Sequence, residues 1–94
     1  MTETNYAKVL YELNIAPEVT ASANAILKAA PEVSEVLSSP VVSLKEKENV
    51  IDKIFPKEIC NFMKVLCRYH KASLAQEIFK EYQEYYNKRH NILN

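Results

Sequence analysis

Apolar side chains recur every three or four residues along most of the chain, a spacing that places them on one face of an α-helix. Prolines interrupt this pattern, and proline is tolerated in the first turn of a helix or between helices but not inside one. The chain divides into six segments at Pro17, Pro31, Pro40, Pro56 and the polar stretch HKAS after residue 69. We predict helices over residues 4–14, 17–29, 31–37, 43–54, 57–69 and 73–89.

The clearest boundary lies in the middle of the chain, in the stretch LSSPVVSLKEKENVI. The Ser38–Pro40 segment is expected to end the third helix. Ser43 and Glu46 have the spacing of a capping box, in which a serine hydroxyl and a glutamate satisfy free backbone N–H groups at a helix start. A second pair with this spacing, Ser73 and Gln76, is expected to open the sixth helix.

The composition supports a single all-α domain. A chain of 94 residues is the size of one domain, and its 48% apolar and 26% charged residues are ordinary for a globular protein. Glycine is absent, although hairpins, bulges and phosphate-binding loops depend on it for positive φ angles. Alanine, leucine, glutamate and lysine, the strongest helix formers, are plentiful. The fold class expected is therefore all-α, a six-helix bundle over residues 1–94.

Charge and hydropathy argue against several classes of protein. Twelve basic and twelve acidic residues leave no net positive charge for a nucleic acid, so no nucleic-acid partner is expected. No apolar run reaches the roughly 18 residues of a membrane-spanning helix, so no direct membrane insertion is expected. The start MTETNYAK resembles neither a signal peptide nor a transit peptide. A bacterial cytoplasm is the simplest compartment that these features suggest.

The residues that carry chemistry are few and scattered. Cys60 and Cys67 lie seven residues apart, roughly 10 Å along a helix, which is too far for a disulfide. We expect two buried free thiols. Cys67 and His70 are the only nucleophile–base pair, and two ligands do not make a zinc site. His90 lies on another segment. We therefore expect no catalytic residue, no metal and no cofactor, and a binding or structural module rather than an enzyme.

The first and fifth predicted helices carry more apolar surface than a small bundle requires. Their apolar arcs span roughly 200° and 220°, about twice what a surface helix needs to meet its core. The arc of the first helix holds Tyr6, Ala7, Val9, Leu10, Tyr11 and Leu13. The arc of the fifth holds Ile59, Cys60, Phe62, Met63, Val65, Leu66, Cys67 and Tyr69.

Two explanations remain for these wide arcs. Either each helix is central and buried on most sides, or part of its apolar face is left for a partner. If the two helices pack side by side, their spare edges line one groove, which is a docking site for an amphipathic helix. The candidate lining is Tyr6, Val9 and Leu13 on one wall, with Phe62, Val65 and Tyr69 on the other.

Three stretches, in order and over nearly all of the chain, resemble the delta subunit of F-type ATP synthases, the oligomycin-sensitivity-conferring protein family. NYAKVLYEL resembles the family's Tyr-Ala-Lys-Ala-Leu-Phe-Glu-Leu start. LSSPVVSLKEKENVIDKIF is similar to its Leu-x-x-Pro-x-Ile/Val-x-x-x-x-Lys stretch. NFMKVLCRYHKASLAQEIFKEYQEYYN resembles its Asn-Phe-Leu-x-x-Leu-x-x-Asn-Gly-Arg-Leu followed by a Phe/Tyr-rich last helix.

Two departures from the family pattern stand out. The family has Asn-Gly where this chain has Tyr69-His70. Glycine there would adopt the left-handed conformation that ends a helix, and histidine tolerates that conformation better than most residues. Family members are also about twice this length and carry a second, C-terminal domain. The chain stops at ILN, about where that domain would begin, so we expect an N-terminal domain whose stalk-binding C-terminal domain is absent.

The resemblance implies a non-catalytic stator subunit of a proton- or sodium-translocating ATP synthase. It implies a groove between the first and fifth helices that binds the N-terminal helix of an alpha subunit. It carries that role to Tyr6, Val9, Asn61, Phe62 and Val65, with Tyr6 and Phe62 as aromatic anchors. The b-subunit stalk would be bound through the missing domain, at the cytoplasmic face of a bacterial inner membrane.

Two rival functions compete with the stator. A free-standing helical adaptor of another pathway would show the same wide arcs without affinity for an alpha-subunit helix. An enzyme using Cys67 would need a thiol with a depressed pKa.

Overall fold

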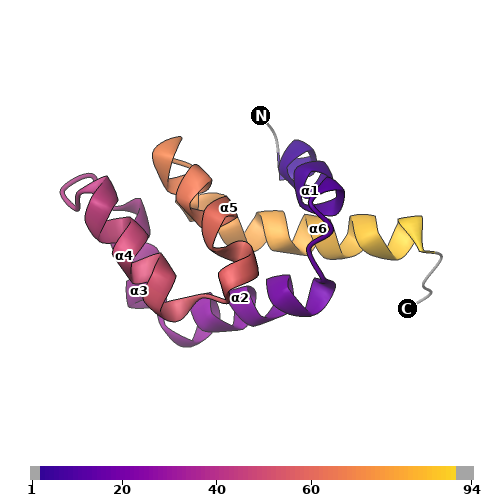
Figure 1. Ribbon diagram of the computed structural model, residues 1–94, viewed down its shortest axis with the longest axis horizontal. Coiled ribbons are helices and arrows are strands. Elements are labelled where there is room, and N and C mark those ends of the chain that lie inside the picture. The colour runs from indigo at the N-terminus through magenta and orange to yellow at the C-terminus, as the bar shows by residue number, and fades with distance from the viewer. Residues whose placement is uncertain (1–2, 91–94) are drawn as a thin grey trace.

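In the computed structural model, residues 3–90 are described and form six α-helices and one short 3₁₀ turn (Figure 1). The helices are α1 Glu3–Glu12, α2 Pro17–Ala29, α3 Pro31–Ser38, α4 Leu44–Ile54, α5 Lys57–Arg68 and α6 Ala75–Arg89. The 3₁₀ turn η1, Ala72–Leu74, leads into α6. The predicted all-α class with six helices is confirmed. The ILN end, where the resemblance places the start of a second domain, lies outside the described residues.

The longest helix, α6, forms the packing surface for α1 and α2. The helices α4 and α5 form an antiparallel pair, and α3 packs against η1. In Figure 1, α1 and α5 lie next to each other, and α2 runs along the opposite edge of α6. None of the helices among residues 3–90 is long and apolar enough to cross a membrane.

One continuous core joins these helices. From α6 it takes Ile78, Phe79 and Tyr82, all at most 3% exposed. The Tyr82 hydroxyl donates a hydrogen bond to the carbonyl of Ile15, which ties α6 to the turn between α1 and α2. Burial raises the pKa of the Tyr82 hydroxyl, so this donor keeps its proton well into the alkaline range.

At the central boundary, the serine half of the predicted capping box forms. The Ser43 hydroxyl accepts a hydrogen bond of 3.2 Å from the Glu46 N–H and caps the start of α4. At the end of α3, the Ser38 hydroxyl donates to the Ser34 carbonyl at 2.8 Å, and the Ser39 hydroxyl accepts from the Val41 N–H at 3.3 Å. These side chains satisfy backbone groups that a glycine-rich turn would leave to water.

The second capping box is wrong. Ser73 lies inside η1 rather than ahead of a helix, and α6 starts at Ala75 without a side-chain cap. An N-cap residue needs an extended backbone, which a residue inside a 3₁₀ turn does not have. Ala72 is 6% exposed, and its burial draws the chain into a turn that continues directly into α6. The spacing of polar residues does not predict this turn, because the turn depends on the burial of the neighbouring Ala72.

Two helices end in the left-handed conformation without glycine. Asn14 and His70 both have φ of 58°. After α5, the Lys71 N–H donates to the Leu66 carbonyl at 2.7 Å and the His70 N–H donates to the Cys67 carbonyl at 3.1 Å. This pair of bonds defines a Schellman motif. The left-handed conformation expected at His70 is therefore confirmed.

The end of α1 has the same geometry. The N–H of Ile15 donates to the Leu10 carbonyl at 3.3 Å, and the N–H of Asn14 donates to the Tyr11 carbonyl at 3.0 Å. Asparagine is the residue other than glycine that most readily adopts this conformation.

Replacing His70 with glycine should stabilise the domain, because a Cβ atom in the left-handed region costs roughly 1–2 kcal/mol. Part of that gain is offset by the extra freedom of glycine in the unfolded chain, so we expect a net rise of about 0.5–1 kcal/mol. Urea unfolding monitored by circular dichroism measures it. His70→Ala is the matched control and should be less stable than His70→Gly. An alanine variant as stable as the glycine variant would contradict the argument.

Candidate functional site

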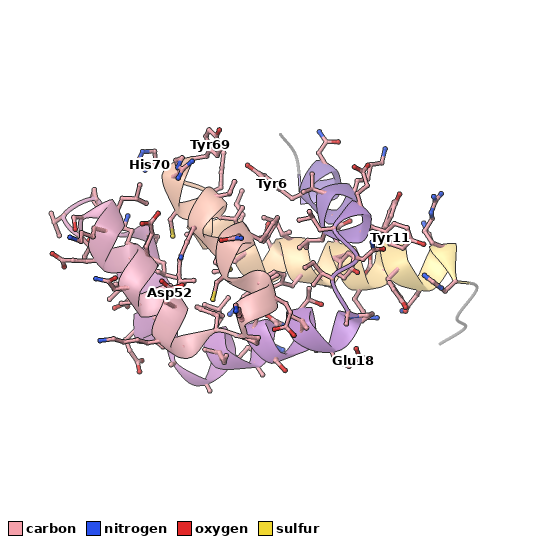
Figure 2. All side chains as sticks on the ribbon, viewed as in Figure 1. Tyr6, Tyr11, Glu18, Asp52, Tyr69 and His70 are labelled. Atoms are coloured by element: carbon pink, nitrogen blue, oxygen red, sulfur yellow. The ribbon has the colours of Figure 1, made fainter. Side chains whose placement is uncertain are left out.

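Two of the residues predicted to line a groove, Tyr6 and Phe62, contact each other between α1 and α5. Tyr6 of α1 and Phe62 of α5 meet edge to face, with ring centroids 6.0 Å apart and an angle of 84° between their planes. Phe62 also lies 6.3 Å from Phe79 of α6, so this pair rests on the core. Figure 2 shows Tyr6 reaching from α1 toward α5. Edge-to-face geometry brings the positive ring edge of one residue to the negative face of the other.

The remaining candidate residues are more exposed to solvent than these two rings. Leu13 is 57% exposed, Tyr69 is 61% exposed and Val65 is 38% exposed. Asn61 is exposed, and Val9 is half-buried. In Figure 1, the start of α1 and the end of α5 lie at the same edge of the molecule. Leu13 directly follows the end of α1, and Tyr69 directly follows the end of α5.

We name this region the α1–α5 surface and define it by two sets of side chains. Its floor is Tyr6 and Phe62, and its rim is Val9, Leu13, Asn61, Val65 and Tyr69. Large apolar side chains that remain exposed in a bundle of this size are candidates for contact with a partner.

The burial of each helix in the core accounts for most of its wide apolar arc. On α5, Ile59, Met63 and Leu66 are fully enclosed, so most of its arc is core. On α1, the same holds for Ala7 and Leu10. The exposed rim residues are what remains of each arc after the core has been formed.

The aromatic anchors suggested by the resemblance are mostly covered by the chain itself. Tyr6 and Phe62 are each 5% exposed, so only their edges are accessible from the α1–α5 surface. Tyr69, at the end of α5, is the aromatic side chain of this surface that is open to solvent. Sequence periodicity places all three on apolar arcs and cannot separate them, because their burial depends on how the two helices face each other.

Two open hollows lie elsewhere on the molecule. One of about 520 Å³ opens between α2 and α6, with Asn24, Phe79 and Gln83 among its lining residues. Another of about 450 Å³ is lined by residues of α2, α3, η1 and α6. Neither hollow is lined by residues of the α1–α5 surface.

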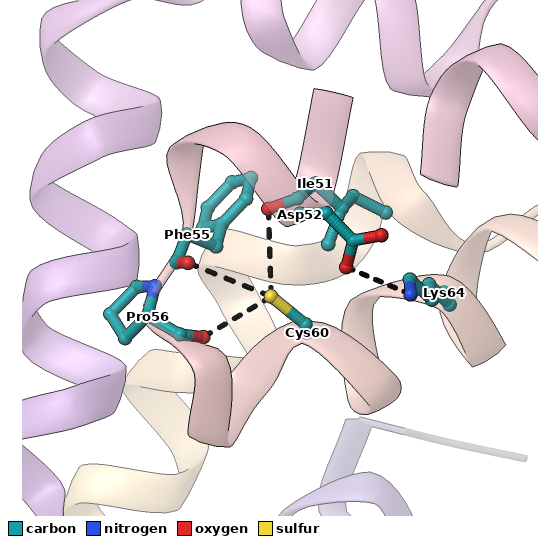
Figure 3. Close-up of polar contacts among 6 residues, drawn as sticks. All are labelled: Ile51, Asp52, Phe55, Pro56, Cys60 and Lys64. Atoms are coloured by element: carbon teal, nitrogen blue, oxygen red, sulfur yellow. Dashed lines mark hydrogen bonds and ion pairs between the residues drawn. The ribbon is translucent and has the colours of Figure 1, made fainter. Parts of the chain in front are cut away.

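Cys60 is a structural thiol. Its sulfur lies 3.5, 3.6 and 3.3 Å from the carbonyl oxygens of Ile51, Phe55 and Pro56, and its single proton can be donated to any one of them in the turn between α4 and α5 (Figure 3). Burial is the largest cause that raises the pKa of the Cys60 thiol, and the nearby Asp52 carboxylate adds to it. On the surface beside this turn, Lys64 Nζ and Asp52 Oδ1 pair at 2.8 Å.

Cys67 does not have the surroundings of a nucleophile. Its side chain is 2% exposed and lies 3.9 Å from the Leu37 carbonyl, to which it donates. Burial raises the pKa of this thiol, the opposite of what nucleophilic catalysis needs. His70 is exposed in the turn after α5. Within residues 3–90, no group of three or more histidine, cysteine, aspartate or glutamate side chains could hold a metal ion.

Sequence patterning does not identify one further cluster, on the other side of α1. Tyr11 lies among Tyr85, Tyr86 and His90 near the end of α6. The one signal for it is the density of aromatic residues in EYQEYYNKRH, which does not reveal the partner helix.

Truncating the floor and the rim of the α1–α5 surface should affect stability very differently. Phe62→Ala should lower the free energy of unfolding by about 3–5 kcal/mol, because it leaves a cavity in the core. Val65→Ala should lower it by less than about 1 kcal/mol, because the side chain is already partly in water. Urea unfolding of both variants measures the difference. Equal losses would mean that Val65 is a core residue and not part of a rim.

Both thiols should react slowly with iodoacetamide in the native protein at pH 7. The reactive species is the thiolate, and a raised pKa together with burial leaves little of it accessible. In urea, both cysteines should react at the rate of a free thiol, which is the matched control. Mass spectrometry with peptide mapping assigns the labelled site. Fast native labelling of Cys67 would restore the enzyme hypothesis.

Residues 3–94 match the protein family described as ATP synthase delta (OSCP) subunit. The chain is similar to ATP synthase subunit delta of Clostridioides difficile, with 31% identity over 95% of this chain and 56% of that protein. It is 33% identical to the same subunit of Alkaliphilus metalliredigens, over 83% of this chain and 49% of that protein. The Prochlorococcus marinus NATL1A subunit is 27% identical over 95% of this chain and 55% of its own length.

The chain thus spans about half the length of these relatives. No solved structure matches it. The family match covers all six helices, including both helices of the α1–α5 surface. On this match and these identities, the chain belongs to the ATP synthase delta (OSCP) subunit family.

Proposed function

We propose that this chain is a non-catalytic, peripheral-stalk subunit of an F-type ATP synthase that holds the N-terminal helix of an alpha subunit on its α1–α5 surface. Family membership supports the stalk role. The observation that carries the finer assignment is the exposed apolar rim, Leu13, Val65 and Tyr69, on two neighbouring helices with a buried aromatic floor between them. An amphipathic helix laid on such a surface buries its own apolar face against the rim.

The chemistry of this surface suits a mechanical role. A stator must resist the torque of the rotor while the catalytic head works, so its contacts must dissociate slowly. Desolvated apolar contacts with a few well-packed anchors give slow dissociation. Leu13 follows α1, whereas Val65 lies in α5 and Tyr69 at its C-terminal end, so a bound helix would be held by exposed side chains from two helices.

The packed floor of the surface, Tyr6 and Phe62, also favours tight binding of a partner helix. Tyr6 and Phe62 are packed before a partner arrives, so binding does not have to order them. Preorganised contacts lose less conformational entropy on association, which increases affinity. Their role is to support the rim residues and to present ring edges to a bound helix.

For the remaining partners and the location, the proposal rests on the family alone. The subunit would lie at the cytoplasmic face of a bacterial inner membrane, peripheral to it. A b-subunit stalk would be contacted by the C-terminal domain that longer members of the family carry. The domain described here would bind no nucleotide and move no ion.

Val65→Asp should abolish binding of an alpha-subunit peptide without unfolding the domain. The peptide covers about 20 residues from the start of the same organism's alpha subunit, enough for more than five helical turns. A carboxylate buried unpaired beneath a bound helix should weaken affinity at least about 100-fold, the equivalent of roughly 3 kcal/mol. Isothermal titration calorimetry measures the affinity, and circular dichroism checks the fold.

Ile54→Asp is the matched control. Ile54 is 39% exposed, almost the same as Val65, but it lies on α4 and outside the α1–α5 surface. It should bind the peptide as the wild type does. Equal loss of binding in both variants would show that the effect is not local to the surface. Unchanged binding by Val65→Asp would contradict the assignment of Val65.

A further inference from the structure

The face of α1 opposite the α1–α5 surface is held by aromatic side chains of α6. Tyr11 meets Tyr85 edge to face, with centroids 5.4 Å apart and planes at 76°, and Tyr86 at 6.1 Å and 63°. Residues two apart on a helix point about 200° from each other. Tyr11 therefore lies nearly opposite both Val9 and Leu13, the rim residues that α1 contributes.

The last turn of α6 completes this cluster. The guanidinium carbon of Arg89 lies 5.5 Å from the centroid of the Tyr11 ring and 5.6 Å from that of Tyr85, within cation–π range. The His90 ring stacks on Tyr86 at 4.1 Å and 18°, and its Nε2 is at hydrogen-bond distance, 3.2 Å, from the Tyr11 hydroxyl. We name these five residues, Tyr11, Tyr85, Tyr86, Arg89 and His90, the aromatic clamp.

α1 is a short helix whose orientation depends on its packing. It has ten residues, and isolated helices shorter than about 12–15 residues are marginal in water. Its principal packing partner is α6, while its contact with α5 runs through the Tyr6–Phe62 pair. The core contacts of Tyr6, Ala7 and Leu10 hold one side of α1, and the clamp holds another. Together they fix the rotation of the helix about its own axis.

That rotation decides where the rim side chains point. We propose that Tyr11 is a positioning residue: the aromatic clamp holds α1 so that Val9 and Leu13 face a bound partner helix, and it couples the α1–α5 surface to the last turns of α6. This inference rests on the function proposed above. Tyr11 itself does not touch the partner, because it lies on the far side of α1.

The coupling has a direct consequence for affinity. If the clamp is weakened, α1 occupies its binding orientation for a smaller fraction of the time, and the apparent dissociation constant rises by the inverse of that fraction. Coupling between two sites is reciprocal, so a bound partner must in turn stabilise the clamp. Amides of the last turns of α6 should then be protected by a ligand that contacts only α1 and α5.

The test compares Tyr11→Leu with Tyr11→Phe in the 94-residue chain. Leucine removes the aromatic contacts but keeps an apolar side chain, and phenylalanine removes only the hydroxyl. We expect Tyr11→Leu to weaken binding of the alpha-subunit peptide about tenfold, and Tyr11→Phe to stay within about twofold of the wild type. Leu44→Ala, an exposed apolar residue of α4, is the reference variant and should bind normally.

Hydrogen exchange provides the readout that a merely structural role would not change. In the Tyr11→Leu variant without peptide, amides of α1 should exchange faster than in the wild type, while those of α4 and α5 should exchange at the wild-type rate. In the wild type, the peptide should slow exchange in residues 85–89. If Tyr11→Leu does not fold, Tyr86→Leu removes part of the clamp from the α6 side and is measured in the same way.

The outcomes separate the two proposals. Failure of the wild type to bind the peptide overturns the proposed function and this inference with it. Tight wild-type binding that Tyr11→Leu retains overturns the inference alone. Loss of protection across all helices in Tyr11→Leu also overturns it, because Tyr11 would then stabilise the whole fold rather than position α1.

Discussion

The packing of α1 and α2 on the buried face of α6 is the interaction on which the rest of this domain depends. Ile78, Phe79 and Tyr82 are enclosed almost completely, and each lies on the side of α6 that faces the core. The Tyr82 hydroxyl adds a directed bond to the carbonyl of Ile15, just after the turn that ends α1. Short helices gain most of their stability from tertiary packing. The helical conformation of α1 therefore depends mainly on its packing against α6. The α1–α5 surface is thus a consequence of how α6 is packed.

Two helices end sharply without glycine, and these endings fix the backbone next to the α1–α5 surface. Asn14 and His70 end α1 and α5 in the left-handed conformation, each with the two hydrogen bonds of a Schellman motif. These are the two helices that carry the rim. Leu13 and Tyr69 are the residues immediately before these turns, so both exposed side chains lie on backbone whose path is fixed. An apolar side chain held in this way loses little freedom when a partner covers it.

Much of this architecture was predictable from local signals. A proline or a capping serine such as Ser43 affects the backbone only within about one helical turn. The helix boundaries that they set can therefore be predicted from sequence. The sixth helix start was missed because the burial of Ala72, a tertiary contact, overrides the Ser73 capping pattern. The candidate groove residues also depend on tertiary contacts that the sequence does not reveal. Tyr6 and Leu13 lie on one apolar arc, yet one is 5% and the other 57% exposed, since only the placement of α5 and α6 decides which is covered. The family could be identified because its motifs extend over nearly the whole chain.

The most direct test is an NMR titration of this domain with the N-terminal alpha-subunit peptide. The account predicts chemical-shift changes concentrated on α1 and α5, at Val9, Leu13, Asn61, Val65 and Tyr69. It predicts none on α3 or α4. Shifts centred on the hollow between α2 and α6 would place the partner elsewhere, and no shifts at high peptide excess would contradict docking on the α1–α5 surface altogether.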